Sequence, residues 1–142
     1  MKNELPFFWR KIETPENAVK IIKICALIFI ALGVFELIMS LFLPHIRTPS
    51  IINILLGAAL YFINSTSVGL IIFLWSLVPA IGELTFRMTF FEVCHAILAM
   101  ALAVVGCRAY LATKKLHRLL HPEEYEKEEE KKEIKSKKAK LN

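Results

Sequence analysis

Two ionisable residues, Glu92 and His95, interrupt the otherwise apolar run FFEVCHAILAM at residues 90–100. Residues three apart in an α-helix lie on the same face, so a helix here would bring the carboxylate and the imidazole together. Glu-x-x-His is the motif with which four-helix carboxylate proteins hold a pair of metal ions. The same pair could instead carry a proton or form a hydrogen-bonded seam between helices. The rest of the chain must decide between a metal site, a proton site and a structural contact.

The distribution of charge along the chain indicates a membrane protein. Hydrophobic residues make up 56% of the 142 residues, and the mean hydropathy is +0.51. Most charged residues lie in 1–23 and 108–142, while the segment between them is nearly uncharged. An apolar middle with charged ends is typical of integral membrane proteins. We therefore infer that the net charge of +5 serves to orient the protein in a lipid bilayer. We expect no nucleic-acid partner.

Four apolar segments are candidates for membrane-spanning helices, which need about 20 mostly apolar residues. They cover approximately residues 24–43, 50–64, 68–84 and 90–111. So few residues join the second and third segments that these must form an antiparallel hairpin. Pro79 lies inside the third segment and predicts a kink, unless a neighbouring group satisfies the carbonyl that it leaves free. The predicted fold is an all-α membrane protein with four transmembrane helices in an antiparallel bundle.

The flanking segments predict the domain boundaries and the orientation. Residues 1–23 form a cytoplasmic or interfacial N-terminal segment, 24–115 the four-helix transmembrane domain, and 116–142 a charged cytoplasmic tail. Lys and Arg are concentrated before the first span and after the fourth, and cytoplasmic flanks carry such an excess. Both termini are therefore predicted to be cytoplasmic. The predicted location is the cell (inner) membrane, or the endoplasmic reticulum membrane in a eukaryote.

Ionisable residues inside the predicted spans are the main functional candidates, because such residues are costly in lipid and are usually retained for a reason. They are Glu36, Glu83, Glu92 and His95. The predicted orientation places all of them in the outer half of the bilayer. Each glutamate also lies on the face of its helix that is rich in small residues, where membrane helices approach closely. We expect an internal polar cluster near the outer side, with at least one glutamate protonated near neutral pH.

Small residues at helical spacing predict where the helices touch. The expected packing residues are Gly33, Gly57, Ala99, Ala103 and Gly106. Small side chains let two backbones approach closely in lipid. Through these faces we expect the protein to pack against itself in a homo-oligomer or against a membrane-protein partner.

A metal centre would need more ligands than the sequence supplies. A di-iron bundle takes Glu-x-x-His from each of two helices and a Glu from each of the other two. This chain has one such motif and no carboxylate within 50–64. A single zinc site on His95 with carboxylates stays open, as does proton or cation coupling, but a hydrogen-bonded seam is the preferred interpretation. We therefore predict no metal ligand and no cofactor.

Enzyme motifs are absent from the sequence. There is no glycine-rich phosphate loop, no G-x-S-x-G, no Asp to orient a triad, and no Cys–His pair arranged as nucleophile and base. The cysteines, Cys25, Cys94 and Cys107, lie in apolar runs and predict no disulfide framework. We expect no enzymatic activity and no catalytic residue.

The segments IINILLGAALYFINSTSVGLIIFLWSLV and VVGCRAYLATKKLHRL resemble a loose group of small four-helix bacterial inner-membrane proteins of unassigned function. In that group a short second helix turns tightly into the third, and the fourth ends in Gly, Arg, an aromatic residue and a basic cluster. Gly106, Arg108, Tyr110 and the cluster Lys114–Arg118 occupy those places here. The turn NSTSVG lacks the Ser-Arg pair that is usual in the group. The resemblance covers residues 20–118 and implies a location, not an activity.

Two functional hypotheses follow, and a metal-binding bundle ranks third. The leading one is a small multi-pass membrane protein with a structural or accessory role. The alternative is a small proton- or cation-coupled transporter that uses the outer-half carboxylates with His95. Glu36 is similar in position to the essential first-helix glutamate of small multidrug resistance transporters, although those chains are shorter and lack the charged tail.

Overall fold

A computed structural model describes residues 7–82 and 90–140 of the chain. Every element in these ranges is a helix, which confirms the all-α prediction. In chain order they are the short 3₁₀ turn η1 (Phe7–Trp9), α1 (Pro15–Met39), the 3₁₀ turn η2 (Pro44–Ile46), α2 (Arg47–Phe62), α3 (Thr66–Gly82), α4 (Phe90–Leu120) and α5 (Pro122–Lys140).

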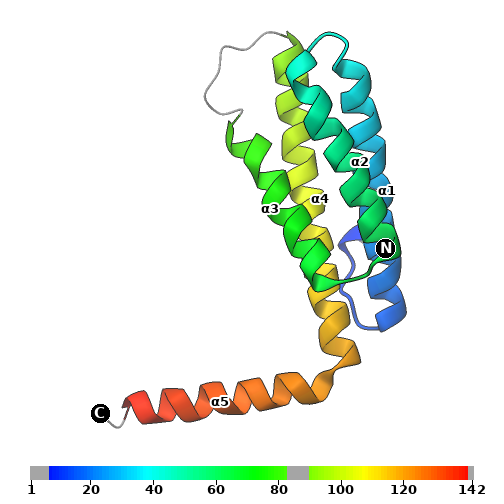
Figure 1. Cartoon of the computed structure of the whole chain (residues 1–142). Coiled ribbons are helices and arrows are strands. Elements are labelled where there is room, and N and C mark those ends of the chain that lie inside the picture. The colour runs from blue at the N-terminus through cyan, green and yellow to red at the C-terminus, as the bar shows by residue number, and fades with distance from the viewer. Residues whose placement is uncertain (1–6, 83–89, 141–142) are drawn as a thin grey trace, which may run out of the picture.

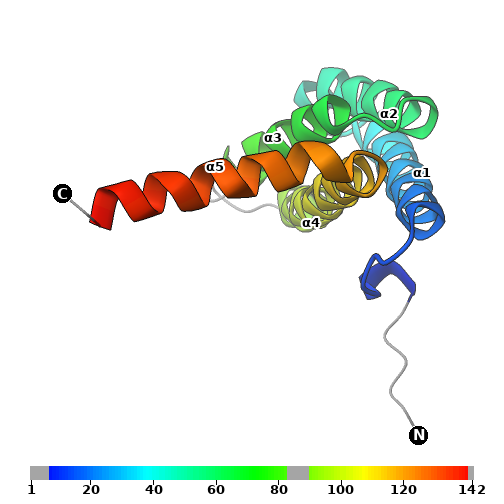
Figure 2. The same cartoon turned by 90° about the horizontal axis from the view of Figure 1, so that it is seen from below.

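The helices α1–α4 form an antiparallel bundle built from two hairpins (Figure 1). The main contacts are those of α1 with α2, of α3 with α4 and of α1 with α4, whereas α2 and α3 contact each other little. The turn η2 lies at one end of the bundle, and η1 and the start of α5 lie near the other (Figure 1). The helix α5 leaves the bundle and extends away from it, as the view from below in Figure 2 shows.

The helix boundaries correct the predicted spans by a few residues. The helix α1 begins earlier, where the Thr14 side chain caps it and Pro15 occupies the first position. It ends at Met39 rather than at residue 43, because tight turns bond the next amides back to Ile38 and Met39 ahead of Pro44. The helix α2 begins at Arg47, so Pro49 lies in its first turn, where no amide hydrogen is needed.

Four full-length membrane spans are not confirmed. Two of the described helices are long and apolar enough to cross a membrane, namely Pro15–Met39 and Glu92–Leu120, and Thr66–Ile81 is apolar but shorter. The helix α2 has 16 residues. At 1.5 Å per residue this is roughly 24 Å, compared with a hydrocarbon core of about 30 Å. Pro79 lies inside α3, and the kink predicted there stays a prediction.

Glycines set the close approach within each hairpin. A Cβ added at Gly33 would lie 3.1 Å from the Ser50 carbonyl oxygen of α2, and one at Gly57 would lie 3.0 Å from the Ala26 carbonyl oxygen of α1. In the second hairpin, a Cβ at Gly106 would lie 2.5 Å from the Ser76 hydroxyl. These contacts are to backbone or to short side chains, which cannot move aside easily.

Of the two predicted packing alanines on α4, Ala99 is fully buried and Ala103 is half-buried.

The side chain of Arg108 attaches the N-terminal segment to α4. The Arg108 guanidinium donates hydrogen bonds to the carbonyl oxygens of Phe8 (2.8 Å) and Arg10 (2.7 Å).

Replacing Gly57 by Leu should push α1 and α2 apart, because the new side chain would meet the α1 backbone. We expect a loss of about 1–3 kcal/mol in the free energy of unfolding, measured by unfolding of the detergent-solubilised protein in increasing SDS. The control is Ala31→Leu, at an exposed position of α1. Equal stability of the two variants would contradict the close contact at Gly57.

Candidate functional site: a polar cavity shared by four helices

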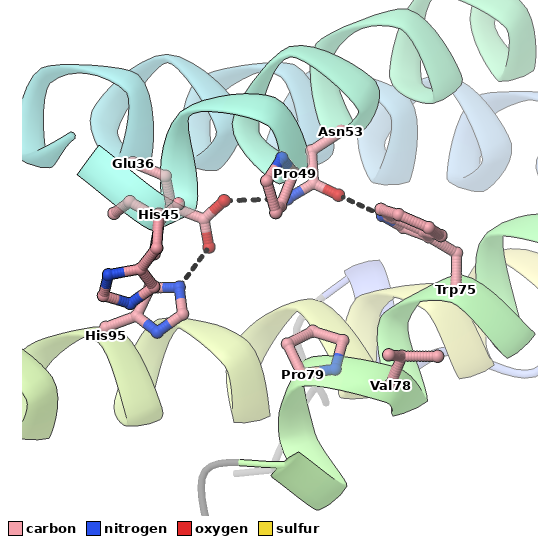
Figure 3. Close-up of a pocket in the computed structure, with 9 residues that line it drawn as sticks. Glu36, His45, Pro49, Asn53, Trp75, Val78, Pro79 and His95 are labelled. Atoms are coloured by element: carbon pink, nitrogen blue, oxygen red, sulfur yellow. Dashed lines mark hydrogen bonds and ion pairs between the residues drawn. The ribbon is translucent and has the colours of Figure 1, made fainter. Parts of the chain in front are cut away.

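A cavity of about 210 Å³ lies between the helices toward the end of the bundle that carries η2 (Figure 3). All four bundle helices and η2 contribute to its wall. The lining residues are Glu36, His45, Ile46, Pro49, Asn53, Trp75, Val78, Pro79 and His95.

Glu36 is the charged residue at the centre of this arrangement. It lies on the face of α1 that also buries Phe29, Gly33 and Ser40, which follow a spacing of three or four residues. Its exposed fraction is 2%. One carboxylate oxygen, Oε2, accepts a hydrogen bond of 2.7 Å from the Asn53 side-chain amide. A buried carboxylate is costly unless it is hydrogen-bonded, so Asn53 is its principal support from α2.

Asn53 extends the network to the third helix. Its side-chain oxygen accepts a hydrogen bond of 2.9 Å from the Trp75 indole nitrogen of α3. The amide is therefore used on both sides, as donor to Glu36 and as acceptor from Trp75 (Figure 3). Among the described residues, no buried side-chain nitrogen or oxygen lacks a hydrogen-bond partner.

His95 brings α4 to the same carboxylate. Its Nε2 atom lies 3.9 Å from Oε1 of Glu36, and its exposed fraction is 7%. This distance is too long for a hydrogen bond but suits an ion pair when the imidazole is protonated. The exposed ring of His45, from η2, stands edge-on to the His95 ring with 6.4 Å between ring centres. The two rings lie together on one side of Glu36 (Figure 3).

The predicted polar cluster is only partly assembled in the described residues. Glu36 and His95, which are far apart in the sequence, meet across the cavity. Glu92 is half-buried on α4, one turn before His95, and does not contribute to the cavity wall as described. Glu83 lies outside the described residues.

The sequence interpretation missed the bridging side chains. The candidates predicted from the sequence do not include Asn53, Trp75 or His45. A signal for the first two was present, because Asn53 stands in the apolar run IINILLGAAL and an indole N–H buried in a membrane helix needs an acceptor. The position of His45 depends on the η2 turn and had no such signal.

The chemistry open to this site is the holding of a proton or a small cation. In residues 7–82 and 90–140, no three or more His, Cys, Asp or Glu side chains are grouped so that they could hold a metal ion. The described geometry therefore supplies no ligand set for the zinc alternative. What it does supply is one carboxylate with an imidazole opposite, in a space that would admit a few water molecules at about 30 Å³ each.

Replacing Asn53 by Leu should destabilise the bundle, because it leaves both the Glu36 carboxylate and the Trp75 N–H without their partner. We expect a loss of about 1–3 kcal/mol in the free energy of unfolding, measured by SDS titration in mixed micelles. Asn64→Leu, at the exposed turn between α2 and α3, is the matched control. A stability equal to that of the control would show that the hydrogen-bonded chain is dispensable.

Comparisons with protein-family models, with curated proteins and with solved structures find no match to this chain.

Proposed function

We propose that this protein is a multi-pass integral membrane protein in which α1–α4 cross the bilayer, and that its role is structural or accessory. The observation that carries the proposal is the distribution of polar and apolar side chains over the bundle. Polar side chains are enclosed, and large apolar side chains cover the outside.

The buried polar residues come from all four bundle helices and from the turn after α1. They are Glu36, Ser40, Ser50, Asn53, Ser76, His95 and Thr113. The outer surface shows the opposite character. Leu55 on α2 is 63% exposed, Val78 on α3 is 63% exposed and Met100 on α4 is 64% exposed, and α1 exposes Phe35 and Ile38. Contiguous apolar surface of this kind is unfavourable in water and favourable against lipid.

The short helices α2 and α3 pack beside the two long helices, and this packing supports their location in the membrane. The helix α2 packs along α1, and α3 packs along α4, which are the two long apolar helices. If α1 and α4 cross the bilayer, α2 and α3 lie at the same depth as the helices along which they pack. A helix shorter than the bilayer is accommodated by local thinning, at a modest cost per ångström.

The charges at the two ends of the bundle support cytoplasmic termini. The end at which α1 begins and α4 ends holds Lys20, Lys23 and Arg108, followed by the cluster from Lys114 to Arg118. At the η2 end, the described part of the chain holds Arg47. This asymmetry follows the positive-inside rule. The Glu36 cavity would then lie in the outer half of the membrane.

The helix packing limits which surfaces a partner protein could contact. Gly33, Gly57 and Gly106 are occupied by contacts within the chain. A second copy or a membrane-protein partner would therefore meet the outer apolar faces, such as the one with Val78, and not the small-residue faces. No enzymatic activity is proposed.

Single cysteines introduced into a variant without the native cysteines should report this topology. In intact cells, a membrane-impermeant maleimide should label Arg47→Cys, in the η2 region, and should leave Ser67→Cys and Lys127→Cys unlabelled until the membrane is opened. All three positions are exposed in the structure. Labelling of position 67 or 127 from outside would contradict the proposed orientation, and recovery of the protein in the soluble fraction would contradict the membrane location.

The contact between Glu36 and His95 favours a second candidate, a proton- or cation-coupled transporter. A carboxylate and an imidazole 3.9 Å apart can pass a proton through an intervening water molecule, or lose their mutual attraction when a cation enters. The sequence hypothesis invoked Glu36, Glu83 and Glu92 with His95, and of these Glu36 and His95 line the described cavity. The structural role and the coupled role make different predictions for the loss of one charge.

Glu36→Gln keeps the shape of the side chain and removes its charge, so it should abolish any pH-dependent flux of protons or cations into liposomes. In a Trp9→Phe variant that keeps Glu36, Trp75 is the single tryptophan. Its indole donates to Asn53, which donates to Glu36, so its fluorescence should change with pH if Glu36 changes its charge. Glu13→Gln, at an exposed position, is the control. If no flux occurs at any pH and the fluorescence is unchanged, the transporter candidate fails and the structural role stands.

A further inference from the structure

A second and larger cavity lies at the end of the bundle opposite the Glu36 cavity. Its volume is about 620 Å³, and it forms a groove between the start of α1, the α2–α3 turn and the last turns of α4. We call it the α1–α4 groove. Its lining residues are Pro15, Glu16, Val19, Lys20, Lys23, Asn64, Leu116 and Leu120.

One part of the α1–α4 groove is cationic. Lys20 and Lys23 are exposed and three residues apart, so they lie on one face of α1. Glu16 precedes Lys20 by one turn, and the formal charge of the lining is therefore +2 − 1 = +1. The Lys23 ammonium stands 5.3 Å from the centre of the Tyr61 ring of α2. Asn64 adds an amide donor from the turn.

The other part of the α1–α4 groove is apolar. Val19 is half-buried, the exposed fraction of Leu116 is 5%, and Leu120 is 57% exposed. An inorganic anion would use the lysines and leave these side chains in water. An amphiphile with an anionic head and a hydrocarbon part would use both.

We propose that the α1–α4 groove binds an anionic phospholipid of the cytoplasmic leaflet, with its phosphate at Lys20 and Lys23 and the start of an acyl chain against Leu116 and Leu120. The proposal rests on the membrane location argued above. Lys23 directly precedes the apolar part of α1, which is the level at which lipid headgroups would lie. Basic sites at the cytoplasmic ends of membrane helices attract the anionic lipids of that leaflet.

Native mass spectrometry of the full chain, delipidated in mild detergent, tests the proposal. Increasing concentrations of phosphatidylglycerol or of phosphatidylcholine with the same acyl chains are added. We expect one phosphatidylglycerol to bind at a concentration at least about tenfold lower than phosphatidylcholine. The double variant Lys20→Gln/Lys23→Gln should lose this preference. The matched control, Lys131→Gln/Lys132→Gln in the exposed helix α5, removes the same charge and should keep it.

Three outcomes would overturn the proposal. They are an absence of preference in the wild type, an equal loss in the control variant, and displacement of the lipid by millimolar inorganic phosphate, which would indicate a site for a free anion. Inorganic phosphate without effect supports the lipid. Retention of the double variant in the membrane fraction, with the same maleimide labelling, separates failure of this site from failure of the membrane proposal.

Discussion

The burial of the Glu36 carboxylate is the constraint on which the arrangement of the bundle depends. A carboxylate with 2% exposure needs hydrogen-bond donors or a counter-charge, and α1 itself supplies neither to its two oxygens. The donor comes from Asn53 on α2, which is itself supported by Trp75 on α3, and the imidazole comes from His95 on α4. One buried group thus specifies a partner on each of the other bundle helices. A rotation of any of these helices would leave a polar group in an apolar interior.

Close helix contacts make that network possible. The backbone of α1 approaches α2 at Gly33 and at Gly57. Gly33 lies about one turn before Glu36 in α1, and Gly57 lies about one turn after Asn53 in α2. At such a distance, the short side chain of Asn53 reaches Glu36 directly. The second hairpin is held in the same way at Gly106. Because α2 and α3 contact each other little, the bridge between the hairpins on that side depends on Trp75, whose long side chain reaches Asn53.

The two ends of the bundle differ in chemistry, and this difference organises the functional proposals. The η2 end encloses a carboxylate and an imidazole beneath the exposed ring of His45, in a small cavity suited to a proton or a small cation. The other end exposes Lys20 and Lys23 above an apolar groove, beside the N-terminal segment that Arg108 attaches to α4. In a bilayer the first site would face the outer half, and the second would lie at the cytoplasmic headgroups. A protein of this design would be oriented and anchored by one end while its other end holds the groups that can change charge.

The sequence by itself determined the all-α character, the order of the helices and the candidates Glu36 and His95, because apolar runs, prolines and isolated charges are local signals. The predicted antiparallel hairpin of the second and third segments is wrong as a packed pair, because α2 packs on α1 and α3 on α4. It placed Gly33, Gly57 and Gly106 on packing faces but could not say which faces meet. Only the tertiary structure decided that Asn53 and Trp75 bridge three helices, and that Glu92 stands outside the described cavity wall while His45 enters it. The reason is physical. Spacing along a helix fixes which residues share a face, whereas the partner of a face depends on the rotation and depth at which separate helices pack, and these are set by contacts between residues distant in the chain.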